Sequence, residues 1–180
     1  MKLLLRILGA LGVVALLGAV GLYVYAGTLP TTWHVSVSRD LAAPPEAIGP
    51  LVATPASWSR WMNGPPADAH GTTFTPSGPA AGPGAGQAWE GPGTHGKMEI
   101  ATVDSAGITY TMVMEDSQTP AHGSIAWTAH GTGTTVTWTD EGDFSGVSLG
   151  GIFVGMMEKG LTEHIGLALD ELGKVAAKQE

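Results

Sequence analysis

WHVSVSRDLAAPPEAIGPLVATPASWSRW, residues 33–61, contains a strand pattern and two helix-start signals in close succession. In WHVSVS the apolar residues alternate with polar ones, which is typical of a strand with one buried face. PPEAIGPLVA (44–53) predicts a short helix, because proline is well tolerated in the first helical turn. Thr54 and Pro55 then have the character of an N-cap and a first helical residue. We therefore expect a second short helix that runs toward the last tryptophan of the stretch.

Six further strands are expected after the two short helices, because short β-prone runs alternate there with turn signals. Gly-containing turns at 104–107 and 130–133 predict hairpins, whereas the Gly/Pro/Ala-rich segment 77–86 predicts a loop. From about Gly150 to Lys178, apolar residues recur every three or four positions, which predicts one long helix. This order of elements indicates an α+β fold. The six runs are TTFTP, QAWEG, GKMEIATV, ITYTMVME, GSIAWTA and TTVTWTD.

Three motifs carry a resemblance to a known family. VSVSRDLAAPPEAIGPLVATPASWSRW resembles the opening of the START-related, Bet v 1-like polyketide cyclase superfamily, with a strand, then A-P-x-E-x-[IV], then Trp-x-x-Trp. GTTVTW (133–138) and GLALDEL (166–172) resemble a late strand and the final helix of that superfamily. Ser57 replaces its usual acidic residue before Trp-x-x-Trp, and Gly173 replaces a lysine near its end. The resemblance covers roughly residues 32–178.

The resemblance implies a helix-grip fold. In that fold a curved antiparallel sheet, here of about seven strands, surrounds a long C-terminal helix, and two short helices follow the first strand. A hydrophobic cavity lies between the sheet and the long helix. Members of the superfamily bind sterols, lipids, polyketides or other apolar molecules, and some cyclise or dehydrate them. The motifs are structural, so they imply the fold more strongly than an activity.

The N-terminal segment predicts a membrane anchor (1–27) ahead of a ligand-binding domain (28–180). Twenty uncharged residues run from Ile7 to Ala26, long enough to span the hydrocarbon core as a helix. Lys2 and Arg6 precede this run, so we expect a cytoplasmic N-terminus and an extracytoplasmic or periplasmic C-terminal domain, single-pass in the cell (inner) membrane. The alternative is a signal peptide that is cleaved after the same run. Both interpretations export the domain.

Composition excludes several classes of function. Beyond the anchor, six Lys and Arg stand against 16 Asp and Glu, a net charge of 6 − 16 = −10, which disfavours binding to nucleic acid. The chain has no cysteine, which excludes disulfides, thiol catalysis and Cys-ligated metal sites. Its histidines and carboxylates show no metal-ligand spacing. We expect no metal and no cofactor, and as partners a hydrophobic small molecule or lipid and the membrane.

Two motifs match catalytic or nucleotide-binding patterns without the structural context that these require. GVSLG (146–150) fits G-x-S-x-G, but a nucleophile there needs later acid and histidine partners on other strands. His164 is the only histidine after Ser148, and it lies sixteen residues further along a predicted helix, too far away to act as its base. We therefore expect Ser148 near the start of that helix, where serine suits capping. GPGTHG (91–96) fits G-x-G-x-x-G, but a predicted strand follows it instead of a helix.

Aromatic and Met residues are numerous, with six Trp and seven Met, and both types suit the walls of an adaptable apolar pocket. Many of them lie at positions that face inward on the predicted strands, on the short helices or on the final helix. Such residues form either an ordinary hydrophobic core or a ligand site. The predicted ligand-binding set is Trp58, Trp61, Phe74, Trp89, Met98, Tyr110, Met112, Met114, Trp127, Trp138, Met157, Leu161 and His164.

No residue is assigned to catalysis from the sequence, and His164, Tyr110 and Glu90 are the acid–base candidates. His164 borders the apolar stripe of the final helix, where it is either a hydrogen-bonded core histidine or a base. Three functions remain open: a membrane-anchored domain that binds a hydrophobic molecule, a cyclase- or dehydratase-like enzyme, and a protein-interaction module of the cell envelope without a ligand. A cavity with converging polar groups favours the enzyme, and a fully packed interior favours the interaction module.

Overall fold

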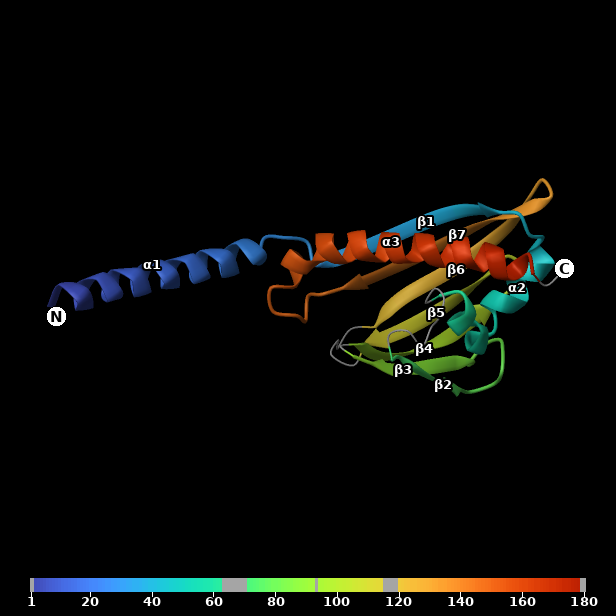
Figure 1. Cartoon of the computed structure of the whole chain (residues 1–180), viewed down its shortest axis with the longest axis horizontal. Coiled ribbons are helices and arrows are strands. Elements are labelled where there is room, and N and C mark those ends of the chain that lie inside the picture. The colour runs from blue at the N-terminus through green and yellow to red at the C-terminus, as the bar shows by residue number, and fades with distance from the viewer. Residues whose placement is uncertain (1, 63–70, 93, 115–119, 179–180) are drawn as a thin grey trace.

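The computed structural model describes residues 2–62, 71–92, 94–114 and 120–178. A long N-terminal helix leads into a seven-stranded sheet, with two short helices after the first strand and one long helix at the end (Figure 1). The elements are α1 (Lys2–Ala26), β1 (Thr32–Leu41), α2 (Pro45–Val52), η1 (Pro55–Arg60), β2 (Thr73–Ser77), β3 (Gly86–Gly91), β4 (Thr94–Val103), β5 (Gly107–Met114), β6 (Ala121–His130), β7 (Gly133–Asp143) and α3 (Gly150–Ala176).

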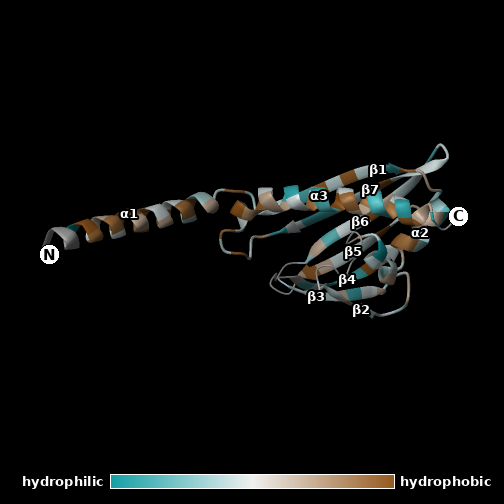
Figure 2. Ribbon diagram, viewed as in Figure 1, coloured by the Kyte–Doolittle hydropathy of each residue, from teal (hydrophilic) through white to brown (hydrophobic). Residues whose placement is uncertain are grey.

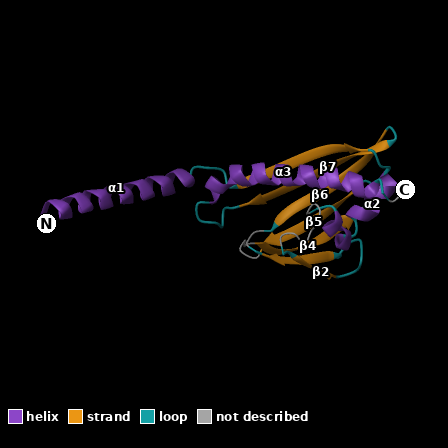
Figure 3. Ribbon diagram, viewed as in Figure 1, coloured by secondary structure: helices purple, strands orange, loops and turns teal. Residues whose placement is uncertain are grey.

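The seven strands form one antiparallel sheet in the order β1-β7-β6-β5-β4-β3-β2. The first strand pairs with the last along its whole length, from Thr32 opposite Asp143 to Leu41 opposite Thr134. Figure 3 shows the sheet curving around α3. The expected α+β, helix-grip architecture is confirmed, including both predicted hairpin turns. Glu115, the last residue of the predicted strand ITYTMVME, lies outside the described residues.

The two short helices follow their sequence signals closely. Thr54 is the N-cap of η1 and Pro55 its first residue, as predicted. η1 is a 3₁₀ helix that buries Trp58, and the Trp58 indole N–H donates to the Val52 carbonyl at the end of α2 (2.8 Å). This bond ties the two short helices together and holds the Trp58 ring beneath the sheet's inner face.

The final helix α3 is buried unevenly along its length. Its second half packs into the core through residues such as Ile165, Leu169 and Leu172, all fully buried. Its first half leaves Phe153 and Met156 exposed. Ser148 does not cap the helix as expected: Leu149 is the N-cap, in the left-handed region at φ 64°, and no side chain caps it.

Helix α1 extends away from the domain (Figure 1), and its residues are mostly hydrophobic (Figure 2). The large apolar side chains between Ile7 and Tyr25 are exposed. Residues Arg6–Ala26 are long and apolar enough to cross a membrane. The junction is packed: the Leu29 side chain lies against Gly151, where an added Cβ would approach it to 2.7 Å. The end of α1 and the start of α3 therefore lie at the same end of the domain.

Candidate functional site

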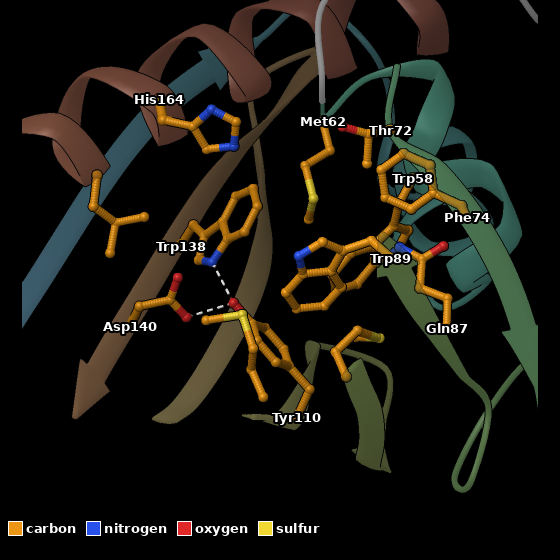
Figure 4. A pocket seen from close by; sticks show the side chains of 13 residues that line it. Trp58, Met62, Thr72, Phe74, Gln87, Trp89, Tyr110, Trp138, Asp140 and His164 are labelled. Atoms are coloured by element: carbon orange, nitrogen blue, oxygen red, sulfur yellow. Dashed lines mark hydrogen bonds between the residues drawn. The ribbon is translucent and has the colours of Figure 1, made fainter. Parts of the chain in front are cut away.

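A cavity of about 250 Å³ lies between the inner face of the sheet, η1 and the middle of α3. Its walls are mostly aromatic rings and methionine side chains, and its polar groups are few (Figure 4). His164 lines it yet is solvent-exposed, so the cavity reaches the surface beside α3. The described lining residues are Trp58, Met62, Thr72, Phe74, Gln87, Trp89, Met98, Tyr110, Met112, Trp138, Asp140, Leu161 and His164.

A buried hydrogen-bonded group forms one wall of the cavity. The Tyr110 hydroxyl donates to Asp140 Oδ1, and the Trp138 indole N–H donates to the Tyr110 oxygen (2.7 Å). Tyr110 and Asp140 are each only 3% exposed and Trp138 2%. Figure 4 shows the three side chains meeting at the Tyr110 hydroxyl, opposite Trp89 and Met62. The arrangement places a hydroxyl and a carboxylate at the edge of an otherwise apolar space.

The strand register explains how a tyrosine on β5 reaches an aspartate on β7. Tyr110 is paired with Gly123 of β6, and Gly123 is paired in turn with Asp140. Because the intervening residue has no side chain, the Tyr110 ring crosses β6 and meets the carboxylate. A Cβ atom on Gly123 would clash with the Tyr110 hydroxyl and with Asp140 Oδ1. The glycine is therefore required for this contact.

Burial dominates the electrostatics of the pair. Removal from water raises the pKa of Asp140 to about 6, although the neighbouring polar groups of Tyr110 and Trp138 act to lower it. Burial, and then the neighbouring Asp140 charge, raise the pKa of Tyr110 well above its ordinary value. At neutral pH Tyr110 is therefore a phenol and Asp140 is largely a carboxylate. The pKa of His164 is lowered by partial desolvation, which favours its neutral form.

The raised pKa of Asp140 predicts an unusual pH dependence of stability. The pKa of Asp140 is about 6 in the folded state and 3.8 in the unfolded state. Its contribution to the free energy of unfolding is therefore fully present below pH 3.8 and is lost as the pH rises through 6. The shift corresponds to about 3 kcal/mol. We expect the free energy of unfolding of the wild type, relative to Asp140→Asn, to rise by this order between pH 8 and pH 4. Chemical denaturation followed by tryptophan fluorescence measures both chains. Identical pH profiles would contradict the burial of an ionisable Asp140.

Nine of the thirteen residues predicted to bind a ligand line this cavity. They come from η1, five strands (β2, β3, β4, β5 and β7) and α3, and the fold brings them together from positions 58 to 164 of the sequence. Their contact with a ligand stays a prediction. The nine are Trp58, Phe74, Trp89, Met98, Tyr110, Met112, Trp138, Leu161 and His164.

The other four lie outside the described cavity wall. Trp61 is fully buried behind it, with its ring against Trp58 and Trp138 (centroids 5.5 and 5.7 Å). Trp127 packs its ring over Gly49 of α2, so it belongs to the core. Met114 is exposed at the end of β5, and Met157 lies on α3 one turn before the cavity begins.

Glu90 does not reach the cavity. Side chains alternate between the two faces of a strand, and on β3 the inward positions are taken by Gln87 and Trp89. Glu90 is exposed and lies beside His95 on the opposite face. It is therefore no acid–base candidate for a molecule in this cavity, which corrects the expectation from sequence.

Four lining residues are absent from the predicted set, and three of them follow a simple rule. Thr72, Gln87 and Asp140 each stand two positions from a predicted aromatic residue of the same strand region, so they share its face. A search for polar residues at that spacing finds all three. The fourth, Met62, comes just after η1, outside any helix or strand. No helical or strand periodicity in the sequence therefore predicts that its side chain faces the cavity.

Among the described residues, the two other motifs lack the structural context that a nucleophile or a dinucleotide site requires. Ser148 is exposed in the loop before α3, and His164 is sixteen residues further along that helix. In GPGTHG, Gly91 ends β3 and Thr94 begins β4, so the motif connects two antiparallel strands instead of opening a helix.

Comparison with known proteins agrees with the fold. A family model described as "Polyketide cyclase / dehydrase and lipid transport" matches residues 32–177. The chain belongs to this family. The match covers every element from β1 to α3 and excludes α1. The polyketide cyclase / dehydrase and lipid transport domain is therefore a hydrophobic ligand-binding or cyclase-like domain, and α1 is an addition to it.

Solved structures share the fold of the family at low sequence identity. A protein from Thermus thermophilus is 14% identical with a TM-score of 0.63, over 82% of this chain and 99% of its own. One from Chromobacterium violaceum is 15% identical with a TM-score of 0.59, over 79% and 96%. DynU16, a protein in the dynemicin biosynthetic locus, is 16% identical with a TM-score of 0.55, over 82% and 48%. At such identities the likeness shows the fold alone. A search of curated proteins found no match.

Proposed function

We propose that this protein is a membrane-anchored domain outside the cytoplasm that binds a hydrophobic small molecule or lipid in the cavity between α3 and the sheet. The observation that carries the proposal is the cavity itself, which the described side chains leave open and which is lined mainly by aromatic rings and methionines. Burying apolar surface there is favourable by about 25 cal/mol per Å². A module that served only protein contacts would have no need to leave this space in its core.

The size of the cavity limits the ligand. Engineered apolar cavities of about 150 Å³ bind benzene, so about 250 Å³ suits a molecule of one or two rings or a short branched chain. A longer lipid would keep part of its length outside, where the cavity opens beside the exposed His164. The methionine side chains of the wall adapt to such shapes more readily than branched residues do.

An enzyme of the cyclase or dehydratase type is the second candidate, favoured by one specific observation. Polar groups converge on the apolar space: the Tyr110 hydroxyl and Asp140 carboxylate on one wall, and His164 at the opening. Asp140, with a pKa of about 6, is suited to move a proton near neutral pH, and an enclosed apolar wall positions a flexible chain. The description of the family covers cyclases, dehydrases and lipid transport alike.

Native mass spectrometry of the full chain, extracted from its own cells in a maltoside detergent, tests the proposal. We expect a fraction of the protein to carry a small apolar adduct, which solvent extraction then identifies. Added 4-fluorotoluene should bind to the remainder. A bare protein mass, together with no binding of 4-fluorotoluene, would overturn the proposal. Incubating the extracted molecule with wild type and with Tyr110→Phe separates carrier from enzyme, because only turnover converts it into a product. A dehydration lowers its mass by one water, and a cyclisation without loss of water changes its chromatographic retention at the same mass.

The apolar end of the domain supports the anchor. Leu29, three residues after α1, packs against the first turn of α3. On the same end Val147, Phe153 and Met156 expose 39%, 47% and 72% of their surface. Exposed apolar side chains next to a helix that can cross a membrane fit a domain held against the bilayer interface.

We expect the mature protein to begin at or near Met1 and to pellet with membranes. High salt or alkaline carbonate should not extract it, whereas detergent should, because the apolar surface of α1 is as long as the hydrocarbon core. Added protease should digest the domain once the outer barrier is opened and spare the helix. Measurement of the intact mass is the control. A mature chain that starts at Gly27 would mean that the N-terminal segment is a cleaved signal peptide and not an anchor. A domain protected from external protease would contradict export in either form.

A further inference from the structure

Asp140 is a buried carboxylate in a cavity whose described wall contains no lysine or arginine. All eight Lys and Arg residues lie in the described part of the chain, and none of them lines the cavity. Arg39 is paired with Asp170 and Lys174 with Glu171. The others are on α1 or at exposed positions, such as Lys97 on the outer face of β4. The charge of Asp140 is therefore not neutralised by a lysine or arginine of the described residues.

Asp140 also has a second acceptor oxygen that none of the hydrogen bonds among the described residues uses. Oδ1 receives the Tyr110 hydroxyl, but the second carboxylate oxygen receives no hydrogen bond from the other residues drawn in Figure 4. The titratable groups that line the cavity are Tyr110 on β5 and His164 on α3, and the described lining residues of η1, β2, β3 and β4 contribute none. Desolvation favours the neutral form of His164, so it does not supply the missing positive charge at neutral pH.

The remaining wall is suited to a cation. Trp58, Trp89, Trp138, Tyr110 and Phe74 contribute five aromatic rings to a space of about 250 Å³. Aromatic faces attract alkylammonium groups, and the attraction is stronger where water is excluded. Apolar rings around a single carboxylate bind a molecule that is both hydrophobic and positively charged better than a neutral one of the same shape.

We propose that the cavity selects apolar molecules that carry an ammonium group, with the positive charge beside the Asp140 carboxylate and the apolar part against the rings. This inference rests on the proposed function, because it names the chemical class of the ligand for the same cavity. It gives the Tyr110–Asp140 pair a role in recognition: Tyr110 orients one carboxylate oxygen, which leaves the other for the ligand. The net charge of −10 beyond the anchor also raises the local concentration of cations.

Two isosteric probes test the inference on the full chain in maltoside micelles. Benzyltrimethylammonium carries the charge, and neopentylbenzene has the same shape without it. At pH 7.5 we expect the cation to bind at least about tenfold more tightly than the neutral probe. Asp140→Asn should remove this preference while still binding the neutral probe. In the wild type the preference for the cation should also shrink as the pH falls from 7.5 to 5, because Asp140 takes up a proton. This second measurement uses the wild type alone, so it does not depend on the folding of the Asp140→Asn variant.

The outcomes distinguish the two proposals. Equal binding of both probes, or tighter binding of the neutral one, would overturn the selection for cations while the hydrophobic cavity stands. Binding of neither probe would overturn the proposed function itself. Short-chain phosphatidylcholine, compared with short-chain phosphatidylglycerol, then identifies the source of the ammonium group. Competition by the choline lipid alone indicates a lipid headgroup, and no competition by either indicates a free amine; both results support the inference.

Discussion

Replacement of Gly123 by alanine is expected to destabilise the domain by about 3–5 kcal/mol. The new Cβ would occupy the space where the Tyr110 hydroxyl meets Asp140, and neither neighbouring strand can move away without breaking the sheet. Overpacking typically costs about 1–3 kcal/mol, and separation of Tyr110 from a buried carboxylate adds a further ~1.5–3 kcal/mol. Denaturant unfolding followed by tryptophan fluorescence measures the loss. A large part of total stability is at stake, because small domains are stable by only about 5–15 kcal/mol.

Gly155→Ala is the matched control. Gly155 lies on α3, and a Cβ added there meets no atom within 4 Å. Alanine also has the higher helix propensity, so this variant should be unchanged or more stable by up to about 1 kcal/mol. If Gly123→Ala unfolds at the same denaturant concentration as Gly155→Ala, the crossing of Tyr110 over β6 is not the packing of this protein.

Replacement of Leu161 by tryptophan is expected to abolish binding in the cavity while the domain stays folded. Leu161 is half-buried on α3 and lines the cavity, so a larger side chain can enter the empty space without displacing the core. We expect the affinity for 4-fluorotoluene to fall by at least about tenfold, a loss of about 1.4 kcal/mol or more. ¹⁹F NMR titration of the full chain, with protein-free micelles as blank, gives the affinity.

Leu167→Trp controls for the added tryptophan. Leu167 lies on the same helix but is 70% exposed, so its replacement changes the surface and not the cavity. The control should bind 4-fluorotoluene as the wild type does. Equal affinity in Leu161→Trp and Leu167→Trp, with both chains folded, would remove the α3 face from the site.

Much of the fold could be predicted because its local signals agree with one another. The proline-started helices, the alternation of the strands and the apolar stripe of α3 each specify one element, and the same elements appear with nearly the same bounds. The Leu149 N-cap could not be predicted in this way. Ser148 is the better capping residue by type, but the backbone turns at Leu149 to bring Gly150 against Phe144.

The cavity could be predicted only in part, because sequence periodicity assigns a face and not a depth. Trp127 and Trp138 are both inward on neighbouring strands, yet the first packs on Gly49 and the second lines the cavity. The difference between the two tryptophans comes from where α2 packs against the sheet, which is a tertiary contact that the local sequence does not indicate. Asp140 was missed because a lone acidic residue in a strand is ordinarily an outward one. Its role depends on Gly123, whose significance emerges only when the strand register is known.

Methionine-methyl NMR of the full chain tests most directly whether the cavity binds apolar molecules. Met62, Met98 and Met112 line the cavity, whereas Met114 and Met156 are exposed outside it, so the protein contains both reporters and controls. On addition of toluene, the methyl signals of the three cavity methionines should shift because of the ring current of the bound molecule. These shifts should saturate with increasing toluene and should be absent in Leu161→Trp. Shifts confined to Met114 and Met156, or cavity methyls that do not respond at saturation, would contradict ligand binding between α3 and the sheet.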